Sequence, residues 1–178
     1  MDLLTHLFLP IAVVYVLRPA LFEHPLAFGL AGFAIFPDVD KLVPVPGGFH
    51  SLLTLLPIAL LVVGLERLSL GTRRYAPVAI ALLYSHLLLD IVDGNFVTLL
   101  SPLVKTGIQL QYPGHVVLGG AWPIVVQGDL LSLAVGKPQP GSGGPGTYPL
   151  VQKYGVLSVL VFLSVIAPRL SRSPEASE

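Results

Sequence analysis

Cysteine is absent from the 178 residues, and charged side chains make up only 11% of them. Without cysteine the chain can form neither disulfides nor thiolate zinc sites, so any metal ion must be bound by histidine and carboxylate. Ten basic and ten acidic residues give a net charge of zero, and no basic tract follows a predicted helix face. The chain therefore lacks the positive surface that nucleic-acid binding requires, and we expect no nucleic-acid partner.

Apolar residues, by contrast, are abundant: 53% of the chain is hydrophobic, and its mean hydropathy is +0.80. This composition is typical of an integral membrane protein. Apolar stretches run over residues 3–17, 25–36, 51–70, 76–93 and 150–168. We therefore expect an all-α integral membrane protein with about five transmembrane helices, some of them short.

Glycine and proline break the pattern between the fourth and fifth stretches. Residues 116–135 are long enough to cross a bilayer but contain Pro123 and Asp129, which favours a re-entrant or interfacial segment. Residues 137–149 have the composition of a flexible linker. We predict one membrane domain over 1–178, with a core over 1–104, an irregular and linker segment over 105–149 and a last transmembrane helix over 150–170.

Charge asymmetry orients the predicted helices. Five alternating spans gather six arginines on one side: Arg18, Arg67, Arg73, Arg74, Arg169 and Arg172. Because basic loops favour the cytoplasm, the opposite side is predicted to be extracytoplasmic. Six titratable residues fall on that opposite side: His6, Asp38, Asp40, His50, His86 and Asp90.

In the segment "SHLLLD", His86 and Asp90 are four residues apart and share one helix face. Ionisable residues inside a membrane are costly unless something compensates them, and a divalent cation would do so. Asp38 and Asp40, in "FPDVDKL", follow a stretch too short to span a bilayer, which would hold them below the headgroup surface. We predict that all six residues are metal ligands.

Simpler interpretations remain open for individual residues. Asp38 and Asp40 can end a helix in a solvated turn, and a single buried histidine is more often part of ordinary packing than a ligand. Asp93 is either a group near the metal or a solvated helix end. Ser51 is suited either to capping the third helix or to binding a ligand. The role of His115 is left open.

Four motifs carry a resemblance to a known family: "THLFLP", "FPDVD", "HS" and "SHLLLDIVDGNFVTLLSP". Together they resemble the membrane-bound metal-dependent hydrolases of bacteria and archaea over about the first hundred residues. The resemblance implies functional roles for the same six residues. This chain differs from the family pattern in two places. Family members often have a basic residue and glycine before the His-Ser pair, where this chain has "PGGFHS", and often Asp-His or Asp-Ser after the second acid, where it has Lys41. The family is also distantly similar to zinc-dependent phospholipase C, which implies phosphoester chemistry.

We therefore predict a hydrolase that cleaves a phosphoester of a membrane lipid or lipid-linked substrate with a metal-activated water. The donor set suits zinc, with manganese and iron as alternatives, and one or two ions. Asp40 or Asp93 is predicted as the general base, and Ser51 as a substrate contact. The alternatives are a structural metalloprotein and a small ion or proton transporter built on the same cluster.

Overall fold

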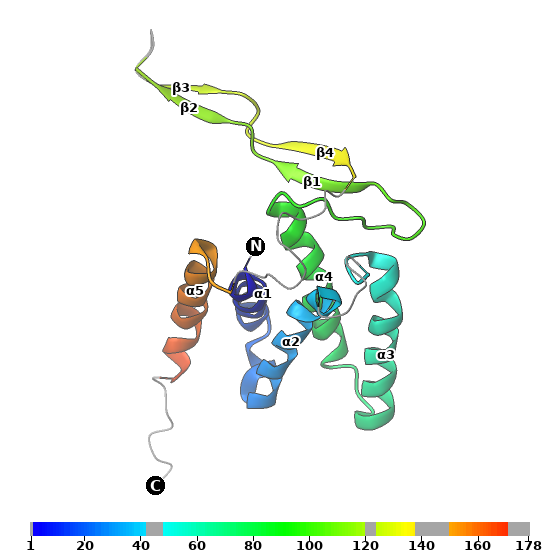
Figure 1. Cartoon of the computed structure of the whole chain (residues 1–178). Coiled ribbons are helices and arrows are strands. Elements are labelled where there is room, and N and C mark those ends of the chain that lie inside the picture. The colour runs from blue at the N-terminus through cyan, green and yellow to red at the C-terminus, as the bar shows by residue number, and fades with distance from the viewer. Residues whose placement is uncertain (1, 42–47, 120–123, 138–149, 171–178) are drawn as a thin grey trace.

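Five α-helices and four short strands make up the computed structural model, which describes residues 2–41, 48–119, 124–137 and 150–170. The helices lie side by side, and the strands form a ribbon at one end of them (Figure 1). The α-helices are α1 (Leu3–Leu17), α2 (Gly32–Ile35), α3 (Leu52–Leu70), α4 (Ala76–Val92) and α5 (Lys153–Leu170). Three 3₁₀ helices, η1 (Pro19–Glu23), η2 (Pro25–Ala31) and η3 (Phe36–Lys41), link α1 and α2 and extend α2.

Local capping fixes where the long helices begin and end. The Asp2 carboxylate accepts a hydrogen bond from Thr5 N at 2.8 Å and caps α1, and the Ser51 hydroxyl accepts from Leu53 N at 3.2 Å and caps α3. Gly71 ends α3 with φ +63°, a left-handed conformation that glycine adopts without strain. In the bundle, the starts of α1, α3 and α5 and the end of α4 all lie at the end that carries the ribbon (Figure 1).

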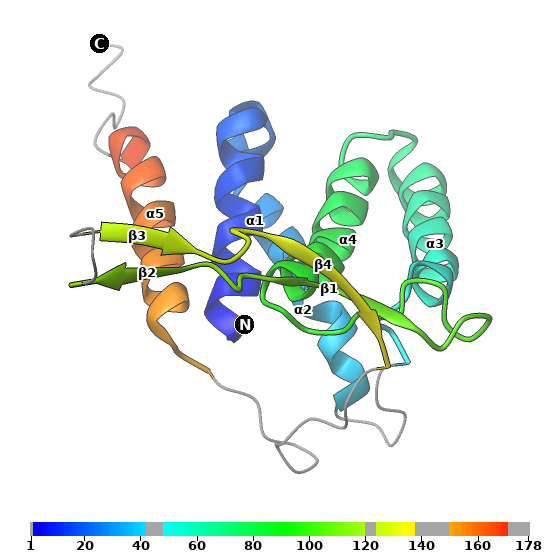
Figure 2. The ribbon, with the colours of Figure 1, turned by 90° about the horizontal axis from the view of Figure 1, so that it is seen from above.

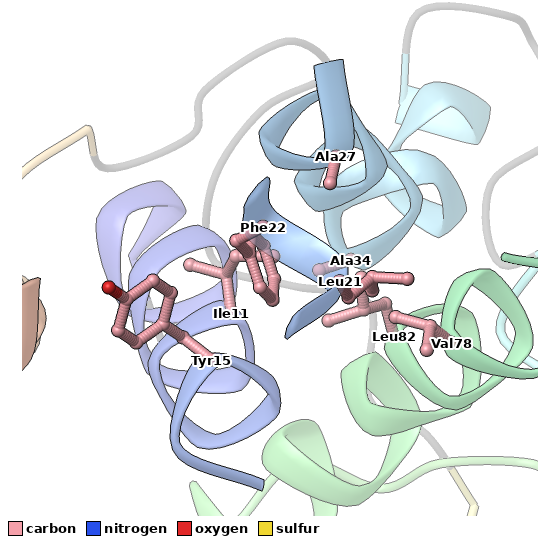
Figure 3. Close-up of a cluster of buried hydrophobic side chains, with 8 residues drawn as sticks. All are labelled: Ile11, Tyr15, Leu21, Phe22, Ala27, Ala34, Val78 and Leu82. Carbon is pink, nitrogen blue, oxygen red and sulfur yellow. The ribbon is translucent and has the colours of Figure 1, made fainter. Parts of the chain in front are cut away.

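Two hydrophobic clusters hold the helices together. The first joins α1, η1, η2, α2 and α4 (Figure 3) and consists of Ile11, Tyr15, Leu21, Phe22, Ala27, Ala34, Val78 and Leu82. The second lies between α3, α4 and the start of the ribbon, and consists of Leu55, Leu83, Leu87, Ile91 and Val97. Since α4 contributes to both clusters, it is the central helix of the bundle.

The strands overturn the expectation of an all-α fold with an irregular segment. Strand β1 (Gly107–Gln111) pairs with β4 (Ser132–Gly136), and β2 (His115–Leu118) pairs with β3 (Ile124–Gln127), both antiparallel. The resulting ribbon crosses over the ends of the helices (Figure 2). Valine and isoleucine favour strands in these short pieces, and the glycines and prolines that suggested irregularity separate the strands. The fold is therefore mixed α and β.

The expectation of about five transmembrane helices is also wrong. Among the described residues, α3 is the one helix that is both long and apolar enough to cross a membrane, whereas α1, α4 and the apolar part of α5 are shorter. The second apolar stretch forms η2 and α2, so it does not build one continuous α-helix. Most of the linker expected over 137–149 lies outside the described residues.

Helix α3 leaves much of its apolar surface uncovered. The side chains with exposed fractions of 48% to 86% include Leu56, Leu60, Leu61, Leu65 and Leu68. A contiguous apolar surface of this kind is unfavourable in water and suits contact with lipid. Helix α4, in contrast, is buried along much of its length, including Leu82, Leu83 and His86.

Candidate metal centre

Histidines and aspartates from four segments meet at the ribbon end of the bundle. His6 lies in the first turn of α1, Asp38 in η3 and His50 just before α3, while His86 and Asp90 lie in the last turns of α4. Two overlapping groups each place one ligand atom per residue within 4.8 Å of the others. The first group is His6, His86 and Asp90, and the second is Asp38, His50 and His86.

The Nε2 atoms of the three imidazoles face the two carboxylates. His86 Nε2 lies 3.4 Å from Asp38 Oδ1 and 3.5 Å from Asp90 Oδ2. His6 Nε2 lies 3.4 Å from Asp90 Oδ1, and His50 Nε2 lies 3.4 Å from Asp38 Oδ1 and 3.6 Å from Asp90 Oδ2. Two ligands bound about 2.1 Å from one ion at a tetrahedral angle are about 3.4 Å apart, so these separations fit a shared cation.

The second nitrogen of each histidine is held by an oxygen atom. His6 Nδ1 lies 3.1 Å from Asp2 O, and His86 Nδ1 lies 2.8 Å from Ala34 O. Backbone carbonyls only accept hydrogen bonds, so both Nδ1 atoms donate and leave Nε2 available for a metal. A histidine ligand that donates its other N–H to a carbonyl or carboxylate is the usual arrangement in metal sites.

Asp40 holds the third histidine in the same way. Its Oδ2 lies 2.8 Å from His50 Nδ1 and accepts from Phe49 N at 3.1 Å, and the side chain is 1% exposed. Neither group of candidate ligands includes Asp40, so its geometry favours orienting His50 over direct ligation. Burial alone would lower the pKa of His50, but the carboxylates of Asp38 and Asp40 raise this pKa to about 9. The site thus stabilises positive charge.

The available atoms and charges are compatible with a single divalent ion. His86 offers only Nε2, because its Nδ1 is bonded to a backbone carbonyl, and Nε2 binds one ion. Three carboxylates, those of Asp38, Asp40 and Asp90, bring three negative charges, and the Lys41 ammonium, which pairs with Asp38, brings one positive charge. One divalent cation would make this set neutral, which matters in a buried site.

The five side chains of the cluster differ in burial. His6 and His86 are 1% and 0% exposed, whereas Asp38, Asp90 and His50 have side chains that are 10%, 13% and 17% exposed. The more exposed residues therefore border an accessible face of the cluster. A catalytic metal site needs such an open position, while a structural site encloses its ion.

Other residues predicted from sequence lie around the cluster. The Ser51 hydroxyl is fully buried, caps α3 and contacts Leu99 O at 3.0 Å and Ser101 O at 2.7 Å, so it is engaged in holding the start of α3. Asp93 is exposed and ends α4. His115 is an exposed residue of β2 and belongs to neither ligand group.

Three contributors were not identified from the sequence. Lys41 pairs with Asp38 at the rim, and its position three residues further along a short helix was an available signal. Asp2, next to the predicted first helix, has the residue type of an N-cap but gave no sign of its carbonyl contact with His6. The Ala34 carbonyl has no sequence signal at all, because any residue would supply it.

The structure thus combines a mixed α and β fold, an apolar surface on α3 and a candidate His/Asp metal centre. A family model described as YdjM inner membrane protein matches residues 1–167. The chain therefore belongs to this family, and its location is a bacterial inner membrane. No curated protein and no solved structure matches the chain.

Proposed function

We propose that this protein is a metal-dependent hydrolase that cleaves a phosphoester of a lipid or lipid-linked substrate. The observation that carries the proposal is the convergence of three Nε2 atoms on two carboxylates at a partly open face. Imidazole and carboxylate donors without thiolates suit zinc, and manganese or iron are the alternatives. The residues that hold the ion would be drawn from His6, His50, His86, Asp38 and Asp90.

A bound divalent ion would lower the pKa of a water molecule toward neutrality and polarise a phosphoryl oxygen. In the hydrolysis, the water oxygen forms a bond to phosphorus, the phosphorus–oxygen bond to the alcohol breaks, and the water proton ends on the leaving alcohol. Asp38 and Asp90 border the open face and are placed to accept that proton. Lys41, beside Asp38 and 41% exposed, is placed to contact an anionic phosphate.

A lipid substrate fits the surroundings of the site. The chain is an inner-membrane protein, and α3 exposes apolar side chains next to the end of the bundle that carries His50. A bilayer headgroup can therefore reach the open face without leaving the membrane surface. We further propose that the site opens on the extracytoplasmic side, since Arg18, Arg67 and Arg73 lie at the opposite end of the bundle.

A substrate comparison tests the reaction. Protein purified in detergent and loaded with zinc or manganese should release headgroup or phosphate from phospholipid vesicles faster than it cleaves a soluble nitrophenyl phosphodiester. His86→Ala serves as the inactive control. Preference for the soluble ester would remove the lipid assignment, and metal binding without hydrolysis of any tested lipid would favour a structural metal site.

Thiol labelling tests the orientation, because the native chain has no cysteine. Val39 lies between Asp38 and Asp40 and is 39% exposed, so Val39→Cys should react with a membrane-impermeant maleimide in intact cells. Arg73→Cys, at the other end of the bundle, should react only after permeabilisation. The opposite labelling pattern would place the site in the cytoplasm.

A further inference from the structure

The carboxylate of Asp2 lies where the N-termini of α1 and α5 meet. Asp2 Oδ1 accepts hydrogen bonds from Thr5 N at 2.8 Å and from Thr5 Oγ1 at 2.7 Å. Asp2 Oδ2 accepts from Gln152 N at 2.5 Å and Gly155 N at 3.1 Å, although these residues are about 150 positions away in the chain. Asp2 is 1% exposed, so this carboxylate joins the two helices inside the protein.

The same residue contacts the candidate metal centre through its backbone. Asp2 O accepts from the backbone N of His6 at 3.3 Å and from the His6 ring Nδ1 at 3.1 Å. Asp2 therefore has two roles: its side chain is hydrogen-bonded to the start of α5, and its carbonyl sets the orientation of the His6 ring. If Asp2 shifts, the direction of His6 Nε2 shifts with it, because the ring is hinged on that carbonyl.

Helix α5 approaches Asp2 closely enough to require glycine at position 155. A Cβ atom on Gly155 would lie 2.5 Å from both carboxylate oxygens of Asp2, well inside normal contact distance. Further along the same pair of helices, the rings of Phe8 and Phe162 pack with centroids 5.2 Å apart. The approach at Gly155 is thus the first contact of a continuous interface. The N-termini of two parallel helices also favour a negative charge at this position.

We propose that Asp2 is a positioning residue for His6, and that the close approach of α5 at Gly155 sets the geometry of the metal centre through it. This inference rests on the proposed metal-dependent function. It assigns α5, which contributes none of the candidate ligands, a direct effect on metal binding. It also makes Gly155 a position at which a single methyl group changes the affinity of a site on another helix.

Cobalt binding to the purified protein tests this coupling, because the visible spectrum of Co²⁺ reports the ligand geometry. Asp2→Asn keeps the size of the side chain, but its amide NH₂ must face backbone N–H donors, either those of Gln152 and Gly155 or that of Thr5. Gly155→Ala introduces the clash directly. Each should weaken Co²⁺ affinity about 10- to 100-fold, the usual effect of losing a residue that orients a ligand, and should alter the Co²⁺ absorption bands. Gly64→Ala is the control, since a Cβ there meets nothing within 4 Å.

The double variants separate positioning from general destabilisation. If Asp2 acts through His6, then adding Asp2→Asn to His6→Ala should cause no further loss of affinity. An equal further loss in the His6→Ala background would overturn the inference, as would wild-type affinity and spectrum in Gly155→Ala. Wild-type protein that binds no Co²⁺ would instead overturn the proposed metal centre, and this inference with it.

Discussion

Buried carboxylates occur at both ends of the helical bundle, and they are satisfied in different ways. At the end away from the ribbon, Glu66 of α3 is 7% exposed and accepts four hydrogen bonds from the turn that leads into α4. The donors to Oε1 are Thr72 Oγ1, Arg74 N and Tyr75 N at 2.6–2.9 Å, and the donor to Oε2 is Ala76 N at 2.6 Å. The chain itself therefore compensates the charge of Glu66.

At the ribbon end, the carboxylates of Asp38 and Asp90 face imidazole nitrogens instead. Within the described part of the chain, no backbone N–H donates to either carboxylate, and His86 Nε2 is buried without a hydrogen-bond partner. Three rings are turned so that Nε2 points at these oxygens from distances too long for good hydrogen bonds. Apart from the imidazoles, the side chains of Lys41 and Asn95 are the partners of Asp38 and Asp90 in this part of the chain, so these carboxylates lack the backbone donors that compensate Glu66. This difference is what our proposal of a cation at the ribbon end explains.

Removing a central ligand should have the largest effect. His86→Ala and Asp90→Ala each delete a candidate ligand, His86 from the most buried part of the cluster and Asp90 from its more exposed side, so metal affinity should fall more than 100-fold and lipid hydrolysis should disappear. Zinc titration and the vesicle assay measure the two effects. Glu66→Gln, which changes a buried carboxylate at the other end, should keep its metal. Equal metal affinity in all three variants would contradict the proposal that the ion binds at the ribbon end of the bundle.

Asp40→Asn should have the next largest effect. The amide keeps the volume of Asp40 but weakens its hold on His50 Nδ1, and loss of such an outer partner typically costs 10- to 100-fold in metal affinity. We expect partial metal binding with little or no turnover. Metal occupancy reduced as far as in His86→Ala would instead indicate that Asp40 binds the ion directly, as the sequence suggested.

Glu66→Gln should act on stability alone. One amide oxygen can still accept, but the amide NH₂ must face a backbone N–H at the start of α4, which leaves a buried donor without an acceptor. We expect a loss of about 1–3 kcal/mol in the free energy of unfolding, measured by thermal unfolding in detergent. Loss of metal at temperatures where the variant is folded would contradict the expectation that Glu66 does not affect metal binding.

Ser51→Ala should have the smallest effect. Loss of the α3 cap should lower stability by about 1 kcal/mol, and the contacts of this hydroxyl with Leu99 and Ser101 would be lost with it. Because the hydroxyl is engaged in these contacts, we expect KM for the lipid substrate to stay within about twofold. A large rise in KM with unchanged stability would support the substrate contact predicted from the sequence.

The positions of the long helices were predictable from the sequence because apolar stretches and their caps are local signals. Residues 3–17 form α1, and the stretches from 51 and 76 form α3 and α4 with boundaries shifted by one residue. The ribbon was missed because short β-branched segments separated by glycine and proline resemble an irregular loop until their pairing is known. Pairing is a long-range property, as the register of Gly107 with Gly136 shows.

The composition of the cluster was also predictable, whereas its internal arrangement was not. The spacing of His86 and Asp90 on one helix face is a local pattern, and His6, Asp38 and His50 lie near the same end of the bundle even though the predicted topology of five spans is wrong. Which residue belongs to a candidate ligand group and which one only contacts a neighbouring histidine depends on three-dimensional contacts, so Asp40 could not be distinguished from Asp38. Asp2 and Ala34 act through backbone carbonyls, which no residue type reveals.

X-ray absorption at the metal edge of the purified, zinc-loaded protein tests directly whether the His/Asp cluster binds a metal ion. We expect one zinc ion per chain, bound only by nitrogen and oxygen at about 2.0–2.2 Å, with the scattering pattern of three imidazoles. His86→Ala should lose most of this signal, and Glu66→Gln should retain it. A protein without bound zinc, or a zinc ion with fewer than two imidazole ligands, would contradict the assignment of this cluster as a metal centre.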